Sequence, residues 1–275
     1  MSQQLEVPLF LDPAELKELL GQDKVRVVDL CGTDRYARAH IPGAVSLEYS
    51  AIVAQEPPVM GLLPNEIELG QIVASLGITK ACHVIAYDCE GGGRASRFLW
   101  TLMACGQRKL SLLNGGMFAW EEAGLPLSTD VPEVDDATYP AQYSNMRVVA
   151  DRGYIQSRLT NPENLCIVDT RSTGEYEGSD VRAKHGGHIP GAVHFEWTDM
   201  MDREREMKLL PEDRLRSMLE AKGITPDKEI IVYCHTHHRS AFSFWALKKL
   251  GYQKVRGYVG SWSDWGNQDD TAIES

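Results

Sequence analysis

The sequence predicts an α/β fold built from two tandem domains, each a mainly parallel sheet flanked by helices. Two observations carry this prediction. The hexapeptide HIPGAV occurs at His40–Val45 and again at His188–Val193. In both halves, short apolar runs of strand length alternate with amphipathic segments of helical length, the pattern of a sheet whose parallel strands are joined by crossover helices. A chain of 275 residues also has about the length of two domains.

The repeat extends well beyond the hexapeptide. Val27–Asp29 matches Ile167–Asp169, and Val84–Tyr87 matches Ile230–Tyr233, with the same order in both halves. Self-similarity of this kind indicates a duplicated domain.

Each half contains three predicted strands, which are short runs rich in β-branched residues. A helix is expected between the last two strands of each half, and it ends at Gly106 in the first half and Gly251 in the second. The predicted strands are Val25–Leu30, His83–Tyr87, Lys109–Leu113, Leu165–Asp169, Glu229–Tyr233 and Lys254–Tyr258.

Residues Leu125–Asn145 contain three prolines and several acidic and polar residues, and they show no helical period. We therefore expect a first domain over residues 1–125, a linker over residues 126–145 and a second domain over residues 146–275.

Charge and composition narrow the class of function. The formal net charge is −11, with no compensating basic block, which argues against nucleic acid or an anionic membrane as a partner. The apolar runs have only strand length, and the N-terminal MSQQLEVPLF does not read as a signal peptide. The six cysteines form no CxxC pair, so we expect thiols and a cytoplasmic protein.

The candidate site follows the predicted strand Glu229–Tyr233. Cys234 stands at the tip of this strand, followed by His235, Thr236, His237, His238, Arg239 and Ser240 at the start of a helix. Ligands of α/β sheets bind at the carboxyl ends of strands, where loop N–H groups and a helix N-terminus face them. Together with the basic side chains, these groups favour a thiolate, so we expect Cys234 to be the nucleophile.

The cysteines and histidines also allow two other interpretations, as buried hydrophobic residues and as zinc ligands. Free cysteines are usually small buried hydrophobic residues, and this interpretation is preferred for those in or beside apolar segments. Cys234, His235, His237 and His238 are all zinc ligands by type, but four ligands within five consecutive residues do not easily surround one ion. No metal is therefore expected. The four cysteines interpreted as buried are Cys31, Cys82, Cys105 and Cys166.

Taken together, these motifs resemble rhodanese domains over nearly the whole chain, roughly residues 8–125 and 145–268. The segments that carry the resemblance are the strand ending in aspartate, HIPGAV, the strand leading into the active loop and the late Gly-x-x-x-W segment. The loop Cys-His-Thr-His-His-Arg is similar to the Cys-x-Thr-His-His-Arg loop of tandem-domain thiosulfate:cyanide sulfurtransferases from Azotobacter and Pseudomonas.

The resemblance implies that the second domain is catalytic and the first silent, with Asp88 at the position of Cys234. It also implies that Asp169 ties to the backbone near the active loop and that Arg171 helps to bind the donor. Where mammalian-type relatives have a second arginine, this chain has Glu175. Cys89 follows Asp88 and reproduces the Cys-to-Arg spacing of the active loop, but it is interpreted as a non-catalytic thiol.

The implied reaction is a two-step sulfur transfer through a persulfide on Cys234, without metal or organic cofactor. The donor would be a small anion, thiosulfate, held with Arg239, Ser240, Arg171 and the loop residues His235, Thr236, His237 and His238. The acceptor would be cyanide, a thiol or a protein. Three alternatives stay open, namely a 3-mercaptopyruvate sulfurtransferase, a persulfide-delivery protein, and a phosphatase or arsenate reductase. Such oxyanion enzymes resemble Cys-x5-Arg, whereas this loop is Cys-x4-Arg.

Overall fold

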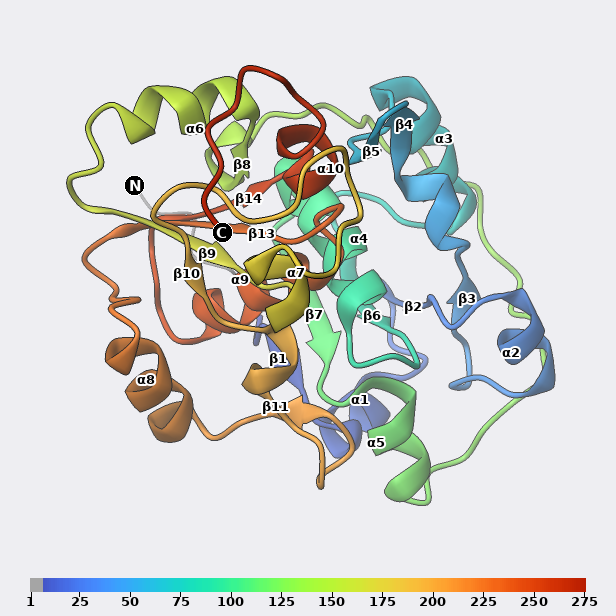
Figure 1. Ribbon diagram of the computed structural model, residues 1–275. Coiled ribbons are helices and arrows are strands. Elements are labelled where there is room, and N and C mark those ends of the chain that lie inside the picture. The colour runs from blue at the N-terminus through green and yellow to red at the C-terminus, as the bar shows by residue number, and fades with distance from the viewer. Residues whose placement is uncertain (1–6) are drawn as a thin grey trace. The chain divides into compact units, whose positions relative to one another are not determined.

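The computed structural model of the protein describes residues 7–275 (Figure 1). These residues form two compact units. The first unit contains residues 7–52, 64–145 and 202–209, and the second contains residues 53–63, 146–201 and 210–275. Each unit therefore includes one short segment that belongs, by sequence, to the other repeat.

The first unit is built on a parallel five-stranded sheet with the order β1-β7-β6-β2-β3. Its strands are β1 Phe10–Leu11, β2 Val25–Asp29, β3 Val45–Ser46, β6 His83–Tyr87 and β7 Leu110–Leu113. Its helices are α1 Pro13–Leu19, α2 Thr33–Arg38, the 3-10 helix η1 Tyr49–Ile52, α3 Glu66–Ser75, α4 Gly93–Ala104 and α5 Gly116–Glu122.

The second unit repeats this topology, with the strand order β10-β9-β13-β14-β8 and parallel pairing throughout. Its sheet strands are β8 Val149–Ala150, β9 Leu165–Asp169, β10 Val193–His194, β13 Glu229–Tyr233 and β14 Val255–Tyr258. Its helices are η2 Met146–Val148, α6 Arg152–Leu159, α7 Thr173–Glu177, η3 Trp197–Met200, α8 Glu212–Ala221, α9 Arg239–Lys249 and α10 Ser261–Trp265.

Two short two-stranded sheets accompany the two five-stranded sheets. The strands β4 Ala54–Glu56 and β5 Val59–Leu62 form an antiparallel hairpin that belongs to the second unit. The strands β11 Met201–Asp202 and β12 Lys208–Leu209 form a second two-stranded sheet. No described helix is long and apolar enough to cross a membrane.

Each unit has its own hydrophobic core around the central strands. In the first unit Ile85 and Leu113 pack with Trp120, and in the second Ile231 packs with Trp265. The central strands are buried because helices cover the sheet, which is the usual environment of a parallel sheet. The predicted α/β fold of two repeated, mainly parallel sheets is thereby confirmed.

The six predicted strands are all present, with ends that differ by at most one residue. The sequence did not reveal the edge strands β1, β3, β8 and β10, because strands of two residues are too short to show an alternating pattern. Among the described residues, no helix or strand lies between Glu122 and Met146. The predicted domain boundaries stay predictions.

The HIPGAV segment is fixed in the same way in both units. The hydroxyl of Tyr233 accepts a hydrogen bond of 3.2 Å from the Ile189 N–H, and His188 stacks on Tyr176 with ring centroids 3.8 Å apart. In the first unit Tyr87 accepts from the Ile41 N–H at 3.1 Å, and His40 stacks on Tyr36 at 3.8 Å. The repeated sequence therefore encodes one repeated contact, which anchors the segment to β13 in the second unit and to β6 in the first.

Candidate active site

Cys234 lies in the second unit, directly after β13 and before α9 (Figure 1). The residue is fully buried. Its N–H donates to Ser261 Oγ at 3.4 Å, and its carbonyl oxygen accepts from the Trp262 N–H at 2.9 Å. The start of the active loop is thus fixed by α10, which follows the neighbouring strand β14.

The surroundings of Cys234 stabilise a thiolate. Burial alone raises the pKa of this thiol, because a charged sulfur loses hydration. The charge of Arg239 and hydrogen bonds from the hydroxyl and N–H of Ser240 outweigh burial, so the pKa of Cys234 lies below its ordinary value. The positive end of α9 acts in the same direction.

Arg239 is held next to Cys234 by Glu175, the third residue of α7. Two parallel hydrogen bonds join the guanidinium to the carboxylate, with Nη1–Oε2 at 2.6 Å and Nη2–Oε1 at 2.8 Å. Burial raises the pKa of Glu175, but Arg239 and the Ser172 cap of α7 outweigh this effect and lower it to about 2. Both side chains therefore stay ionised. Glu175 fixes the position of the Arg239 guanidinium that faces the sulfur and offsets its positive charge.

His237 faces the interior of the unit. Its side chain is fully buried, and its Nδ1 lies 2.7 Å from Ser240 Oγ. If the Ser240 hydroxyl donates to the thiolate, it accepts from the Nδ1–H of His237. His237 also has a φ of +54°, an uncommon value for a residue with a side chain. This residue shapes the loop from its inner side.

The other loop residues lie nearer the surface. His235 is partly buried, and burial lowers its pKa, so the imidazole is neutral near pH 7. The ring centroids of His238 and Trp197 are 6.3 Å apart, and Trp197 also packs on Phe242 of α9. Thr236 is partly exposed and contacts the β4–β5 hairpin.

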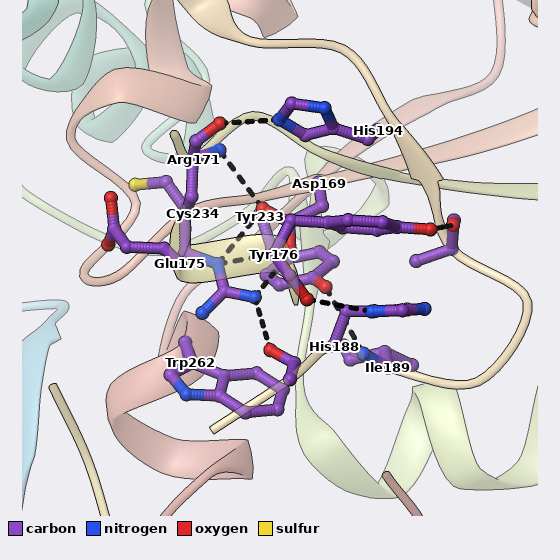
Figure 2. Close-up of polar contacts among 12 residues, drawn as sticks. Asp169, Arg171, Glu175, Tyr176, His188, Ile189, His194, Tyr233, Cys234 and Trp262 are labelled. Atoms are coloured by element: carbon purple, nitrogen blue, oxygen red, sulfur yellow. Dashed lines mark hydrogen bonds and ion pairs between the residues drawn. The ribbon is translucent and has the colours of Figure 1, made fainter. Parts of the chain in front are cut away.

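Figure 2 shows the guanidinium of Arg171 between the carboxylate of Asp169 and the ring of Trp262. Arg171 is fully buried and contacts Asp169 through Nε at 3.0 Å and Nη2 at 2.5 Å. It also donates to the carbonyl oxygen of Gly187 at 2.7 Å. Asp169 in turn accepts from the Arg171 N–H at 2.9 Å, and its supporting role in the site stays a prediction. Donor binding by Arg171 stays a prediction.

In the first unit the equivalent loop is filled by the carboxylate of Asp88. Its Oδ1 accepts from the N–H groups of Glu90 and Gly92, and its Oδ2 accepts from that of Ala95 in α4. A carboxylate thus occupies the centre of the loop, where the second unit has a sulfur. The Cys89 thiol donates instead to the carbonyl oxygen of Cys31 at 3.8 Å.

Sequence reasoning missed several residues that shape the site. Glu175 was noted only as a departure from relatives, and Ser261 was not singled out, since neither has a local pattern that marks it. Within the described residues, no group of three or more His, Cys, Asp or Glu side chains is arranged to hold a metal ion.

The fold and the cysteine loop define a class of protein, and the sequence comparison identifies it. The sequence model of the Rhodanese-like domain matches residues 12–123 and 151–268. The chain therefore belongs to the rhodanese family and contains two copies of its domain. Among individual proteins, it is 42% identical to the thiosulfate sulfurtransferase of Azotobacter vinelandii over 98% of this chain and 97% of that protein.

Two further comparisons agree with this assignment. The chain is 40% identical to the thiosulfate sulfurtransferase of Pseudomonas aeruginosa, over 98% of both proteins. Its fold matches the crystal structure of an anaerobic ergothioneine biosynthesis enzyme from Chlorobium limicola, with a TM-score of 0.87 at 21% identity. That match covers 97% of this chain and 70% of the other, and it shows the fold alone.

Proposed function

We propose that this protein is a thiosulfate sulfurtransferase in which Cys234 carries the transferred sulfur as a persulfide. The observation that carries the proposal is the convergence of Arg239 and Ser240 on a fully buried cysteine whose pKa is nevertheless lowered. The two relatives named thiosulfate sulfurtransferase, which match nearly the full chain, support thiosulfate as the donor.

In the first half-reaction the Cys234 thiolate attacks the outer sulfur of thiosulfate. A new S–S bond forms, the original S–S bond breaks, and its electron pair leaves with sulfite. Arg239 and the Ser240 donors then stabilise the negative charge of the persulfide. Cys234 is buried, so the transferred sulfur is held inside the unit rather than on its surface.

In the second half-reaction an acceptor attacks the outer sulfur of the persulfide. Cyanide would leave as thiocyanate, and the electron pair of the broken S–S bond would restore the Cys234 thiolate. The half-reactions need no oxidant or reductant and no metal. The family relationship supports a sulfur donor and a sulfur acceptor as partners, and we propose cyanide, a small thiol or a protein thiol as acceptor.

The test is the initial rate of thiocyanate formation from thiosulfate and cyanide by the wild type and the Cys234→Ala variant. We expect turnover in the wild type and its complete loss in the variant, because Cys234 is the nucleophile. The matched control is Cys166→Ala, a buried thiol on β9, which should keep the activity.

Two results would contradict the proposal or part of it, and a third would decide among the proposed acceptors. Activity retained by Cys234→Ala would exclude Cys234 as the carrier. No wild-type turnover with thiosulfate, but turnover with 3-mercaptopyruvate, would reassign the donor. Slow turnover with cyanide and fast transfer to a protein thiol would favour persulfide delivery.

A further inference from the structure

The β4–β5 hairpin packs directly against the active loop. Gly61 of β5 has a φ of +75°, and a Cβ atom built on it would lie 2.3 Å from the Thr236 carbonyl oxygen and 2.7 Å from Thr236 Cβ. Real Cβ atoms do not approach other atoms so closely. The hairpin backbone therefore reaches the loop only because residue 61 has no side chain, and the left-handed conformation is also one that glycine adopts freely.

A second contact joins the hairpin to the loop through Ser263 of α10. The Met60 N–H donates to Ser263 Oγ at 3.0 Å. The Ser263 hydroxyl lies within donating distance of two carbonyl oxygens, that of Met60 at 2.9 Å and that of Gly260 at 2.8 Å. The N–H of the same serine donates to the His235 carbonyl oxygen at 2.9 Å. Ser263 is almost fully buried, so this bridge between Met60 and His235 is shielded from water.

The active loop is thus held from two sides. On one side, Gly61 and Ser263 contact Thr236 and His235, the two residues that follow Cys234. On the other side, His237 is locked by burial and by Ser240. The direction of the loop N–H groups, and with it the stabilisation of a sulfur anion, depends on these constraints because a hydrogen bond weakens steeply when its angle changes.

We propose that Gly61 and Ser263 are positioning residues, through which the β4–β5 hairpin holds the Cys234 loop in the shape that stabilises the thiolate and the persulfide. This inference rests on the proposed function of Cys234 and adds a role for the first sequence repeat. Residues 53–63 come from the repeat that has Asp88 in place of the catalytic cysteine, yet they belong to the catalytic unit.

The principal test is Gly61→Ala in the full chain, compared with Gly191→Ala. Gly191 lies in the same unit with a φ of +69°, but nothing lies within 4 Å of a Cβ built on it. Both variants carry the strain of a left-handed alanine, and only Gly61→Ala pushes on the loop. We expect kcat for sulfur transfer to fall by up to about 100-fold in Gly61→Ala, the effect of a displacement of roughly 1 Å near reacting groups. Gly191→Ala should stay within about twofold of the wild type.

A readout independent of turnover is the pH dependence of thiolate absorbance in the ultraviolet. The signal of Cys234 is isolated by subtracting the spectrum of the matching variant that also carries Cys234→Ala. We expect the midpoint to move to higher pH in Gly61→Ala and to stay at the wild-type value in Gly191→Ala. A purely structural role for Gly61 would change stability without moving this midpoint.

Ser263→Ala provides a second variant if Gly61→Ala does not fold. It removes the hydroxyl bridge to Met60 and leaves the Ser263 N–H to bond His235. We expect an upward shift of the thiolate midpoint and a several-fold loss of kcat. Thiolate midpoints and kcat equal to the control in both Gly61→Ala and Ser263→Ala would overturn the inference.

The same measurements separate this inference from the proposed function. If the wild type transfers no sulfur from thiosulfate but the midpoint shifts in Gly61→Ala or Ser263→Ala, positioning stands and the reaction must be reassigned. If the wild type is active and neither variant differs from Gly191→Ala, the reaction stands and the positioning role is wrong.

Discussion

At the residue scale, the chemistry of Cys234 depends on a balance between burial and charge. A buried thiol resists ionisation, as Cys166 shows, where burial outweighs the charge of Lys228 and raises the pKa to about 11. Cys234 is at least as deeply buried, yet Arg239 and Ser240 lower its pKa. The difference between these two cysteines of one unit is therefore the set of donors around the sulfur. Glu175 is part of this difference, because it holds Arg239 in position beside the Cys234 sulfur.

We expect Glu175→Gln to move the thiolate midpoint of Cys234 to lower pH. The amide oxygen of glutamine still accepts from Arg239, but the negative charge that offsets the guanidinium is lost. The pH titration of thiolate absorbance, corrected with the Cys234→Ala background, measures the shift. Glu177→Gln on the same helix is the control, since it removes an equal charge at an exposed position and should leave the midpoint unchanged. A midpoint that rises in Glu175→Gln would show that placement of Arg239 outweighs charge.

At the scale of elements, the active loop depends on the strand beside it. Gly257 of β14 lies beneath the His237 ring, and a Cβ atom built on Gly257 would be 2.1 Å from Nε2 and 2.2 Å from Cε1. The sequence gives no reason for a glycine in the middle of this strand. The reason is space, because His237 turns inward and its ring occupies the place of a side chain on β14.

Gly257→Ala is expected to destabilise the second unit by about 2 kcal/mol, the usual cost of overpacking a buried site. Chemical denaturation followed by tryptophan fluorescence measures the change. Adding His237→Ala should recover part of the loss by removing the clashing ring. Gly153→Ala in α6 serves as the control, because a Cβ there meets only Asp151 Oδ1 at an ordinary 3.6 Å. Equal stabilities of Gly257→Ala and Gly153→Ala would contradict this interpretation.

At the scale of the whole molecule, the two sequence repeats do not coincide with the two compact units. Residues 53–63 of the first repeat belong to the second unit, and residues 202–209 of the second repeat belong to the first unit. In the first unit, the Leu209 N–H donates to Asn114 Oδ1 at 2.8 Å. When one unit unfolds, the segment that its repeat contributes to the other unit is no longer fixed at its two ends. Keeping that segment ordered then costs conformational entropy.

We therefore expect the two units to lose structure together. Trp120→Ala, which removes a fully buried side chain of the first unit, should cost roughly 3–5 kcal/mol and should weaken protection in the second unit as well. Hydrogen exchange of β13 amides, measured by mass spectrometry, reports on this coupling. Phe118→Ala on the same helix is the control, because Phe118 is 41% exposed. Wild-type protection of β13 in Trp120→Ala would indicate that the units unfold independently.

The sequence by itself determined the duplication, the α/β fold and the place of Cys234 after β13. These features are local or periodic, since β-branched runs define strands and the recurrence of HIPGAV reveals the copy. Every predicted strand was found because the central strands are long enough to show a pattern.

Only the tertiary structure decided how the loop is held. Glu175 and Arg239 are 64 residues apart, and Met60 and Ser263 are 203 residues apart. No periodic pattern links such pairs, because the contact arises when separate elements pack against one another. The roles proposed for Glu175, Gly61, Gly257 and Ser263 therefore follow from packing, whereas Cys234 could be predicted as the nucleophile from the loop in which it stands.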